Sequence, residues 1–339
     1  MNNLKLNIVL IPIFVYLFMG CSKKQAAEPV DNSIATVSSF VGNPVAGPVD
    51  GTGTLAYFNR PIGIAFDAAG VLYVADSENG KIRKVAAAGV VTTFAGSGDK
   101  SSADGSAQYA TFNAPYGVAV DASGNCYVSE SGHIRKITPA GIVSTLINNN
   151  LSRPGNLAID ASGNLYVSDY ALNAIFKITP TGVMTRFAGG AGTGATVLVN
   201  LNSPGGLAFD ASGNLYVSDS GNNMIRKITA AGIVTTFAGT GFIGSANGPG
   251  ASATFNFPEG IAIDAAGNIY VADKFNRLIR MISPAGIVST LAGTGIAGST
   301  NGYGDIATFF QPLQIAIDKQ GVLYITDTTD QIRKIVIKK

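Results

Sequence analysis

The segment PGGLAFDASGNLYVSDSGNNMIRKITAAGIVTTFAG, residues 204–239, recurs in close copies through nearly all of the chain after residue 33. Each copy contains four short apolar runs separated by Gly, Asn, Asp and Ser, which favour tight turns. In the first copy these runs are 62–66, 71–75, 81–85 and 90–94. The repeating unit is therefore a small sheet of four strands.

The copies can be counted from the aspartate that precedes the first turn of each one. These residues are Asp67, Asp121, Asp160, Asp210, Asp264 and Asp318, at spacings of 54, 39, 50, 54 and 54 residues. A period in this range, with four strands per unit, predicts a β-propeller. The expected fold class is therefore all-β, with six blades.

The last copy ends after its third apolar run, at 331–336, and so lacks a fourth strand. The segment IATVSSFVG at 34–42 matches the fourth-strand segment IVTTFAG at 233–239. We expect this amino-terminal strand to complete the last blade, which would close the ring and leave no free sheet edge there. The propeller would then span residues 34–339.

Two copies, PEGIAIDAAGNIYVADKFNRLIRMI at 258–282 and PGGLAFDASGNLYVSDSGNNMIRKI at 204–228, resemble NHL repeats. The resemblance extends over essentially all of 34–339 and implies an NHL-type propeller. It implies little about activity, because proteins that resemble this family include enzymes, sensors and scaffolds, and a fold does not fix a function.

Residues 1–20 have the pattern of an export signal, with Lys5 near the start and an apolar run at 8–19. The sequence LFMGC, which ends at Cys21, resembles the lipobox of bacterial lipoproteins and implies cleavage before Cys21 and lipidation of its sulfur. An uncleaved transmembrane anchor is the alternative, but a span needs about 20 apolar residues. Residues 21–33 would form a polar, flexible tether. Ser22 resembles the outer-membrane sorting pattern, so we expect a membrane-anchored protein that faces the periplasm or the cell exterior.

Charge and the scarcity of His and Cys exclude several classes of site. The formal net charge is only +2 and Lys and Arg are spread evenly, so nucleic acid is not an expected partner. His133 is the only histidine, which excludes a multi-histidine metal site and leaves, at most, a lone general base. Cys126 aligns with Leu or Ile in the other blades and is expected in the core. We assign no catalytic residue.

An acidic residue ends the second strand of every blade. These residues are Asp76, Glu130, Asp169, Asp219, Asp273 and Asp327. One hypothesis is a ring of carboxylates around the channel that could hold a ligand or a hard cation such as calcium. The other is that each carboxylate accepts hydrogen bonds from backbone amides of its own following loop. Its repetition in all six blades favours the second hypothesis, because a metal or catalytic site is normally asymmetric.

Basic residues of the third strands repeat with similar regularity and are interpreted as ties between blades. They are Arg83, Arg135, Arg226, Arg280 and Arg333, with Lys177 assigned to the same position in the remaining blade.

Loops between the fourth strand of one blade and the first of the next vary most, at 43–57, 97–111, 190–200, 240–254 and 294–309. Strand direction places these loops on one face, where binding is expected. Their small residues could instead only hold adjacent blades together. The first functional hypothesis is a binding or scaffold propeller for a protein, peptide or glycan. The alternatives are a cation-dependent hydrolase or lyase with a carboxylate-lined site at the channel, and a structural spacer.

Overall fold

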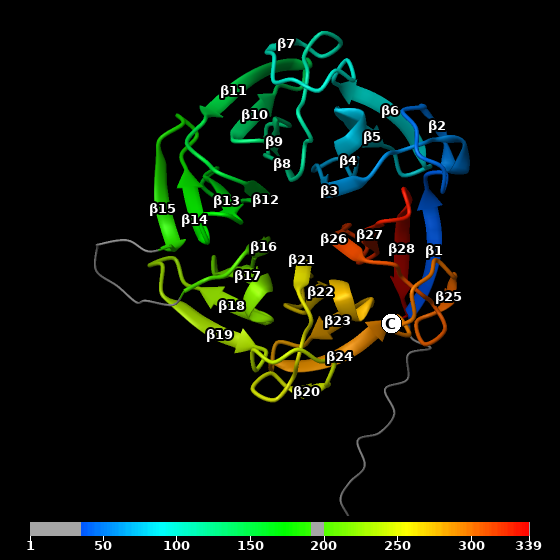
Figure 1. The fold of residues 1–339 in the computed structure, drawn as a ribbon, viewed down its shortest axis with the longest axis vertical. Coiled ribbons are helices and arrows are strands. Elements are labelled where there is room, and N and C mark those ends of the chain that lie inside the picture. Colours follow the sequence, from blue (N-terminus) through cyan, green and yellow to red (C-terminus); the bar gives the residue numbers. More distant parts are fainter. Residues whose placement is uncertain (1–34, 191–199, 339) are drawn as a thin grey trace, which may run out of the picture. The chain divides into compact units, whose positions relative to one another are not determined.

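The structure is a computed structural model that describes residues 35–190 and 200–338. Six antiparallel sheets surround a central axis, and each is one blade (Figure 1). This confirms the prediction of an all-β, six-bladed propeller. The export signal, Cys21 and the tether, residues 1–33, lie outside the described residues, so those assignments stay predictions.

Each blade has four principal strands, which follow one another from the axis outward. Blade 1 contains β3 (Pro61–Phe66), β4 (Leu72–Asp76), β5 (Lys81–Val85) and β6 (Val90–Ala95). Blade 2 contains β8 (Val118–Val120), β9 (Cys126–Glu130), β10 (His133–Ile137) and β11 (Ile142–Asn148). Blade 3 contains β12 (Pro154–Ile159), β13 (Leu165–Asp169), β14 (Ala174–Ile178) and β15 (Met184–Gly189).

The second half of the ring repeats this plan. Blade 4 contains β16 (Pro204–Phe209), β17 (Leu215–Asp219), β18 (Met224–Ile228) and β19 (Val234–Ala238). Blade 5 contains β21 (Pro258–Ile263), β22 (Ile269–Asp273), β23 (Leu278–Ile282) and β24 (Ile287–Ala292). Blade 6 contains β26 (Pro312–Ile317), β27 (Leu323–Asp327), β28 (Ile332–Ile337) and β1 (Ala35–Val41). The observed bounds agree with the expected apolar runs to within about a residue.

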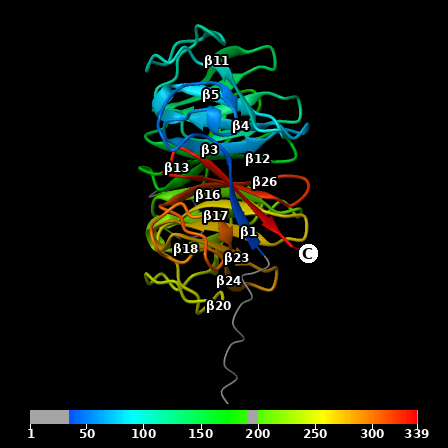
Figure 2. The same ribbon diagram turned by 90° about the vertical axis from the view of Figure 1, so that its right-hand side faces the viewer.

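Strand β1 closes the ring as predicted. It pairs antiparallel with β28, from Ala35 opposite Ile337 to Val41 opposite Ile332. In Figures 1 and 2 the two ends of the described chain, drawn blue and red, lie side by side. The last blade therefore takes strands from both ends of the sequence.

Four blades gain a fifth, two-residue strand that the sequence pattern did not indicate. These strands lie on the outer edge of blades 1, 2, 5 and 6 and are β2 (Gly51–Thr52), β7 (Gly105–Ser106), β20 (Gly248–Pro249) and β25 (Gly302–Tyr303). They come from the long connecting loops. Single turns of 3-10 helix are η2 (Gly53–Leu55), η3 (Ser77–Asn79), η4 (Ser220–Asn222) and η5 (Lys274–Asn276).

The core lies between neighbouring blades. One cluster joins Tyr73 and Ile82 of blade 1 to Phe112 and Cys126 of blade 2. Cys126 is fully buried, as expected, and burial raises the pKa of its thiol far above the ordinary value. Each long loop ends in a fully buried phenylalanine wedged at such a boundary, namely Phe58, Phe112, Phe255 or Phe309. Each loop is therefore anchored where it enters its blade.

Candidate functional site

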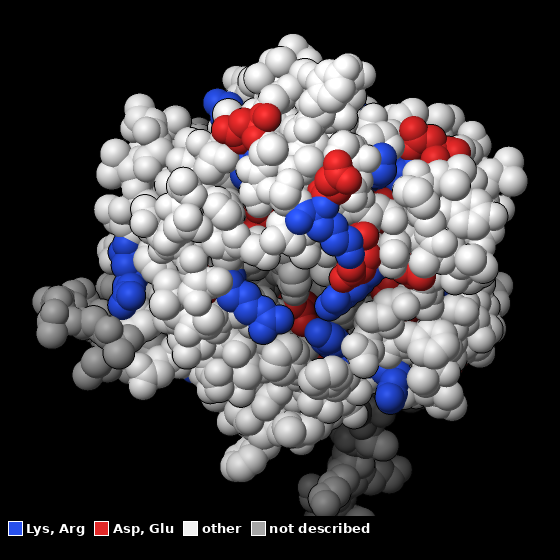
Figure 3. All heavy atoms as spheres, turned by 45° about the horizontal axis from the view of Figure 1, so that its top comes forward, with Lys and Arg blue, Asp and Glu red and all other residues white. Residues whose placement is uncertain are grey.

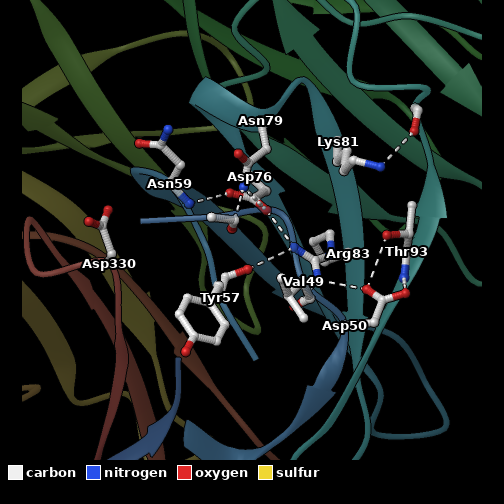
Figure 4. Close-up of polar contacts among 12 residues, drawn as sticks. Val49, Asp50, Tyr57, Asn59, Asp76, Asn79, Lys81, Arg83, Thr93 and Asp330 are labelled. Atoms are coloured by element: carbon white, nitrogen blue, oxygen red, sulfur yellow. Dashed lines mark hydrogen bonds and ion pairs between the residues drawn. The ribbon is translucent and has the colours of Figure 1, made fainter. Parts of the chain in front are cut away.

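The connecting loops leave one blade and enter the next on the same face as the turns after the second strands, called the loop face below. The turns after the first and third strands lie on the other, the turn face. In blade 1 the side chain of Arg83 is fully buried and forms hydrogen bonds to the long loop 43–57 (Figure 4). Its Nη1 donates to Asp76 Oδ2 at 2.7 Å and to the Tyr57 carbonyl at 3.1 Å. Its Nη2 donates to the Val49 carbonyl at 3.0 Å and to Asp50 Oδ1 at 2.6 Å.

The same arrangement occurs in four blades, and we call it the loop clamp. It consists of a fully buried third-strand arginine that donates to two carbonyls of the long loop and to one loop side chain, with an aromatic ring beside the guanidinium. The four arginines and their loop side chains are Arg83 with Asp50, Arg135 with Asp104, Arg280 with Asn247 and Arg333 with Asn301. The rings are Phe58, Phe112, Phe255 and Phe309. The arginines thus fix loops, and through them the junctions between blades.

Blades 3 and 4 depart from this pattern, and one assignment made from the sequence is wrong. Strand register places Phe176 opposite Val167, as Arg83 lies opposite Val74, so Phe176 and not Lys177 holds the arginine position of blade 3. Lys177 instead lies over the Tyr166 ring. In blade 4, Arg226 donates through Nε to Asp219 and through Nη1 to Thr236.

All six second-strand acids are buried, with at most 1% of the residue exposed. Each accepts a hydrogen bond from the backbone N–H seventeen residues earlier, in the loop that leads into its blade. The donors are Asn59, Asn113, Ser152, Asn202, Asn256 and Phe310. Ion pairs to third-strand arginines add to this in blades 1, 2, 4 and 5. The acids therefore lie within separate blades, each among its own partners.

Within the described residues, no three His, Cys, Asp or Glu side chains are close enough together to hold a metal ion. His133 contacts its own turn, with Nδ1 2.6 Å from the carbonyl oxygen of Ser131. Across the described ranges, no helix has the length and apolar character needed to span a membrane.

The channel carries a polar cluster that the sequence interpretation missed. The carboxylate of Glu259, a buried residue at the start of β21, accepts hydrogen bonds from the hydroxyls of Tyr116 at 2.7 Å and of Tyr170. Lys274 Nζ donates to the other oxygen of Glu259 at 2.9 Å. Tyr116 belongs to blade 2 and Glu259 to blade 5, on opposite sides of the ring, so this cluster bridges the channel at its loop-face end.

Electrostatics keep the two tyrosines of this bridge protonated. Burial and the neighbouring Glu259 carboxylate raise the pKa of both Tyr116 and Tyr170 well above the ordinary value. Both phenols therefore stay protonated and donate to Glu259. Figure 3 shows acidic and basic side chains gathered around a hollow near the centre of the ring, while the rest of that view is mainly neutral.

A signal for the bridge was present in the sequence. The residue between Pro and Gly at the start of each first strand, or at the equivalent position, is Ile62, Tyr116, Gly155, Gly205, Glu259 or Leu313. Such variation at one position of an otherwise regular repeat marks the side chains that meet at the axis.

Solved structures with a similar fold include two auxiliary nutrient binding proteins. One, from Bacteroides thetaiotaomicron, is 18% identical with a TM-score of 0.70, and the match covers 90% of this chain and 77% of that one. The other, from Bacteroides ovatus, is 20% identical with a TM-score of 0.69 and the same coverage. At these identities the likeness establishes the fold alone.

Sequence comparison gives a shorter match. Protein SUPPRESSOR OF QUENCHING 1, chloroplastic, from Arabidopsis thaliana is 34% identical over 90 residues, which is 26% of this chain and 8% of that protein. The chain thus corresponds to a small part of this relative.

Two family models match the chain. Residues 58–85 match the NHL repeat, which confirms the resemblance found from the repeats. Residues 100–292 match the SMP-30/Gluconolactonase/LRE-like region. Because this second match covers more than half of the 339 residues, the chain belongs to the SMP-30/gluconolactonase/LRE-like family.

Proposed function

We propose that this protein is an extracytoplasmic binding propeller, held to a membrane by a lipid on Cys21, that presents its loop face to a peptide or glycan. One observation carries the proposal: buried arginines fix four long loops, and two of these loops still expose large apolar side chains on the loop face. These side chains are Phe242, Ile243 and Ile296, each at least 68% exposed.

Exposed apolar groups on fixed loops are suited to recognition. Large apolar side chains are costly to leave in water, and neighbouring ones such as Phe242 and Ile243 commonly mark an interaction site. Because the clamps already order the loops, little conformational entropy is lost when a partner binds. The likeness to two proteins named for nutrient binding supports a binding role.

The direction of β1 supports the same arrangement. Val41 directly precedes the long loop 43–57, so Ala35 lies at the opposite end of this strand, toward the turn face. The chain therefore enters the described part of the ring from the turn face, opposite the loops proposed to bind.

A peptide and glycan array probed with the full-length protein tests the proposal. We expect Phe242→Ser combined with Ile243→Ser to weaken any specific binding roughly tenfold or more, because interface energy concentrates in a few large side chains. Val183→Ser is the matched control, since Val183 is 59% exposed on the turn face. Specific binding that is unchanged by the loop substitutions, or that the control weakens equally, would contradict the proposal, as would no binding at all.

A cation-dependent hydrolase or lyase remains the alternative, supported by the gluconolactonase in the family description. Metal analysis of the purified protein separates the two hypotheses. Stoichiometric calcium or zinc, with a melting temperature that falls on chelation, would favour the enzyme.

A further inference from the structure

The channel has one feature that neither the loop face nor the Glu259 bridge explains. A cavity of about 220 Å³ lies along the first strands of the blades, from the level of Gly63 and Asn156 toward the turn face at Phe66 and Ile159. The Glu259 bridge lies at the start of these strands, on the loop-face side. The cavity therefore lies on the turn-face side of this bridge.

Two amide side chains of this cavity wall have an unpaired donor. Asn156 and Gln314 are 5% and 6% exposed, and both line the cavity. Asn156 Nδ2 and Gln314 Nε2 have no hydrogen-bond partner among the described residues. A buried donor without a partner is costly, so buried polar groups nearly always have one. These two donors indicate that something other than the described chain accepts their hydrogen bonds.

Asn156 and Gln314 hold equivalent positions and depart from the repeat in the same way. The residue is glycine in the other four blades, namely Gly63, Gly117, Gly206 and Gly260. Glycine is needed there because the next blade is close: a Cβ on Gly206 would lie 2.5 Å from the Glu259 carbonyl, and one on Gly260 would lie 2.6 Å from the Leu313 carbonyl. Only blades 3 and 6 have a side chain at this level.

The two amides belong to blades on opposite sides of the ring. Asn156 lies on β12 and Gln314 on β26, which are on opposite sides of the axis in Figure 1. Below them the lining includes the apolar side chains of Ile64, Leu207 and Ile261, and no charged side chain lines the cavity. Because a charged molecule would find no ion-pair partner in this lining, an uncharged molecule fits the cavity best.

We propose that this cavity binds a compact, uncharged molecule of about one ring, with hydrogen-bond acceptors on two opposite edges that pair with Asn156 and Gln314. Its size fits, because a cavity of roughly 150 Å³ already holds a benzene-sized ligand. The site is separate from the loop face and does not depend on the function proposed above.

Calorimetric titration of the full-length protein with 1,4-cyclohexanedione tests the site, because this probe is uncharged, has one ring and carries two opposed carbonyls. We expect saturable binding at one site and a weaker affinity for cyclohexanone, which has one carbonyl. Asn156→Gly and Gln314→Gly introduce the residue found in the other four blades. Each should raise the dissociation constant roughly threefold to tenfold, the effect of one neutral hydrogen bond.

Two further variants serve as a control and as a substitute in this test. Gln108→Gly removes an exposed amide from a loop and should leave binding of the dione unchanged. If Asn156→Gly lowers the melting temperature strongly, Asn156→Ala replaces it, because alanine also removes the donor. Absence of saturable binding, or an affinity that neither Asn156 nor Gln314 affects, would overturn the proposal. If the loop variants lose binding on the array but still bind the dione, the loop face and the cavity are separate sites. That result leaves the cavity proposal standing.

Discussion

The loop clamps of blades 1 and 2 and those of blades 5 and 6 share one geometry but differ in charge. Arg83 and Arg135 meet aspartates of their loops at 2.6 Å, and Arg280 and Arg333 meet asparagines at 2.8 and 2.9 Å. In each clamp the same arginine nitrogens also donate to two loop carbonyls. The arginine therefore holds the loop in place in all four blades. The aspartate of blades 1 and 2 adds a charge to a contact that the loop makes in any case.

The aspartates give the loop side chains of the clamps in blades 1 and 2 a dependence on pH that the asparagines of blades 5 and 6 lack. Burial alone would raise the pKa of Asp50, but hydrogen bonds from Thr93 and Arg83 outweigh it and lower the pKa below the ordinary value. In Asp104, burial is outweighed in the same way by bonds from Arg135 and Thr145. An asparagine at this position cannot titrate.

The largest expected effect is the loss of a clamp arginine. Arg83→Met and Arg280→Met each leave a buried carboxylate, Asp76 or Asp273, without its ion pair, which costs about 3 to 5 kcal/mol. Urea unfolding should give similar losses for both variants, because both remove the same buried contacts. Arg60→Met is the control, since its side chain is 60% exposed, and should change stability little. A much smaller loss for Arg280→Met would show that the loop charge, and not the arginine, dominates the clamp.

Acid should destabilise the long loops of blades 1 and 2 before those of blades 5 and 6. The folded pKa of Asp50 and of Asp104 is lowered, so their stabilisation is present above the unfolded value near 3.8 and is lost as pH falls through the folded pKa. Each side chain is about half exposed, so the loss should be no more than about 1 kcal/mol per loop. As the pH falls below 3.8, hydrogen exchange should increase in 43–57 and 97–111 before it increases in 240–254 and 294–309. Equal increases in all four loops would contradict this account.

The smallest effect is expected from exchanging the loop side chains. Asp50→Asn should cost less than about 1 kcal/mol, because half-exposed ion pairs contribute little. It should also make loop 43–57 as insensitive to acid as loop 240–254. The reverse change, Asn247→Asp, should introduce acid sensitivity into blade 5. Melting temperatures at neutral pH and at a pH below the folded pKa of Asp50 measure both, and a large loss for Asp50→Asn at neutral pH would contradict a minor role for the charge.

Most of the fold could be predicted from the sequence because it depends on local patterns that occur six times. The strand bounds, the number of blades and the closing role of β1 all follow from aligned repeats. The short outer strands β2, β7, β20 and β25 could not be foreseen, because two residues carry no periodicity. In blade 3 the sequence favours Lys177 for the arginine position, because it is the basic residue nearest to that position. Only the strand register of the structure shows that Phe176 holds it.

Less of the candidate sites could be predicted. Tyr116 and Glu259 are separated by 143 residues, and only the closed ring brings them together. Asn156 and Gln314 likewise line one cavity only through the order of the blades. In both cases the signal lies in departures from the repeat, and a comparison that seeks shared residues passes over them.

The pairing of β1 also determines how the ring would bear mechanical load. This strand lies between β28 and β25 and is hydrogen bonded to both. A pull on the chain before Ala35 acts along the strand, perpendicular to these hydrogen bonds. The bonds would share the force in shear instead of opening one after another. A propeller held at its amino terminus would thus be loaded through its most resistant direction, at the seam where the ring closes.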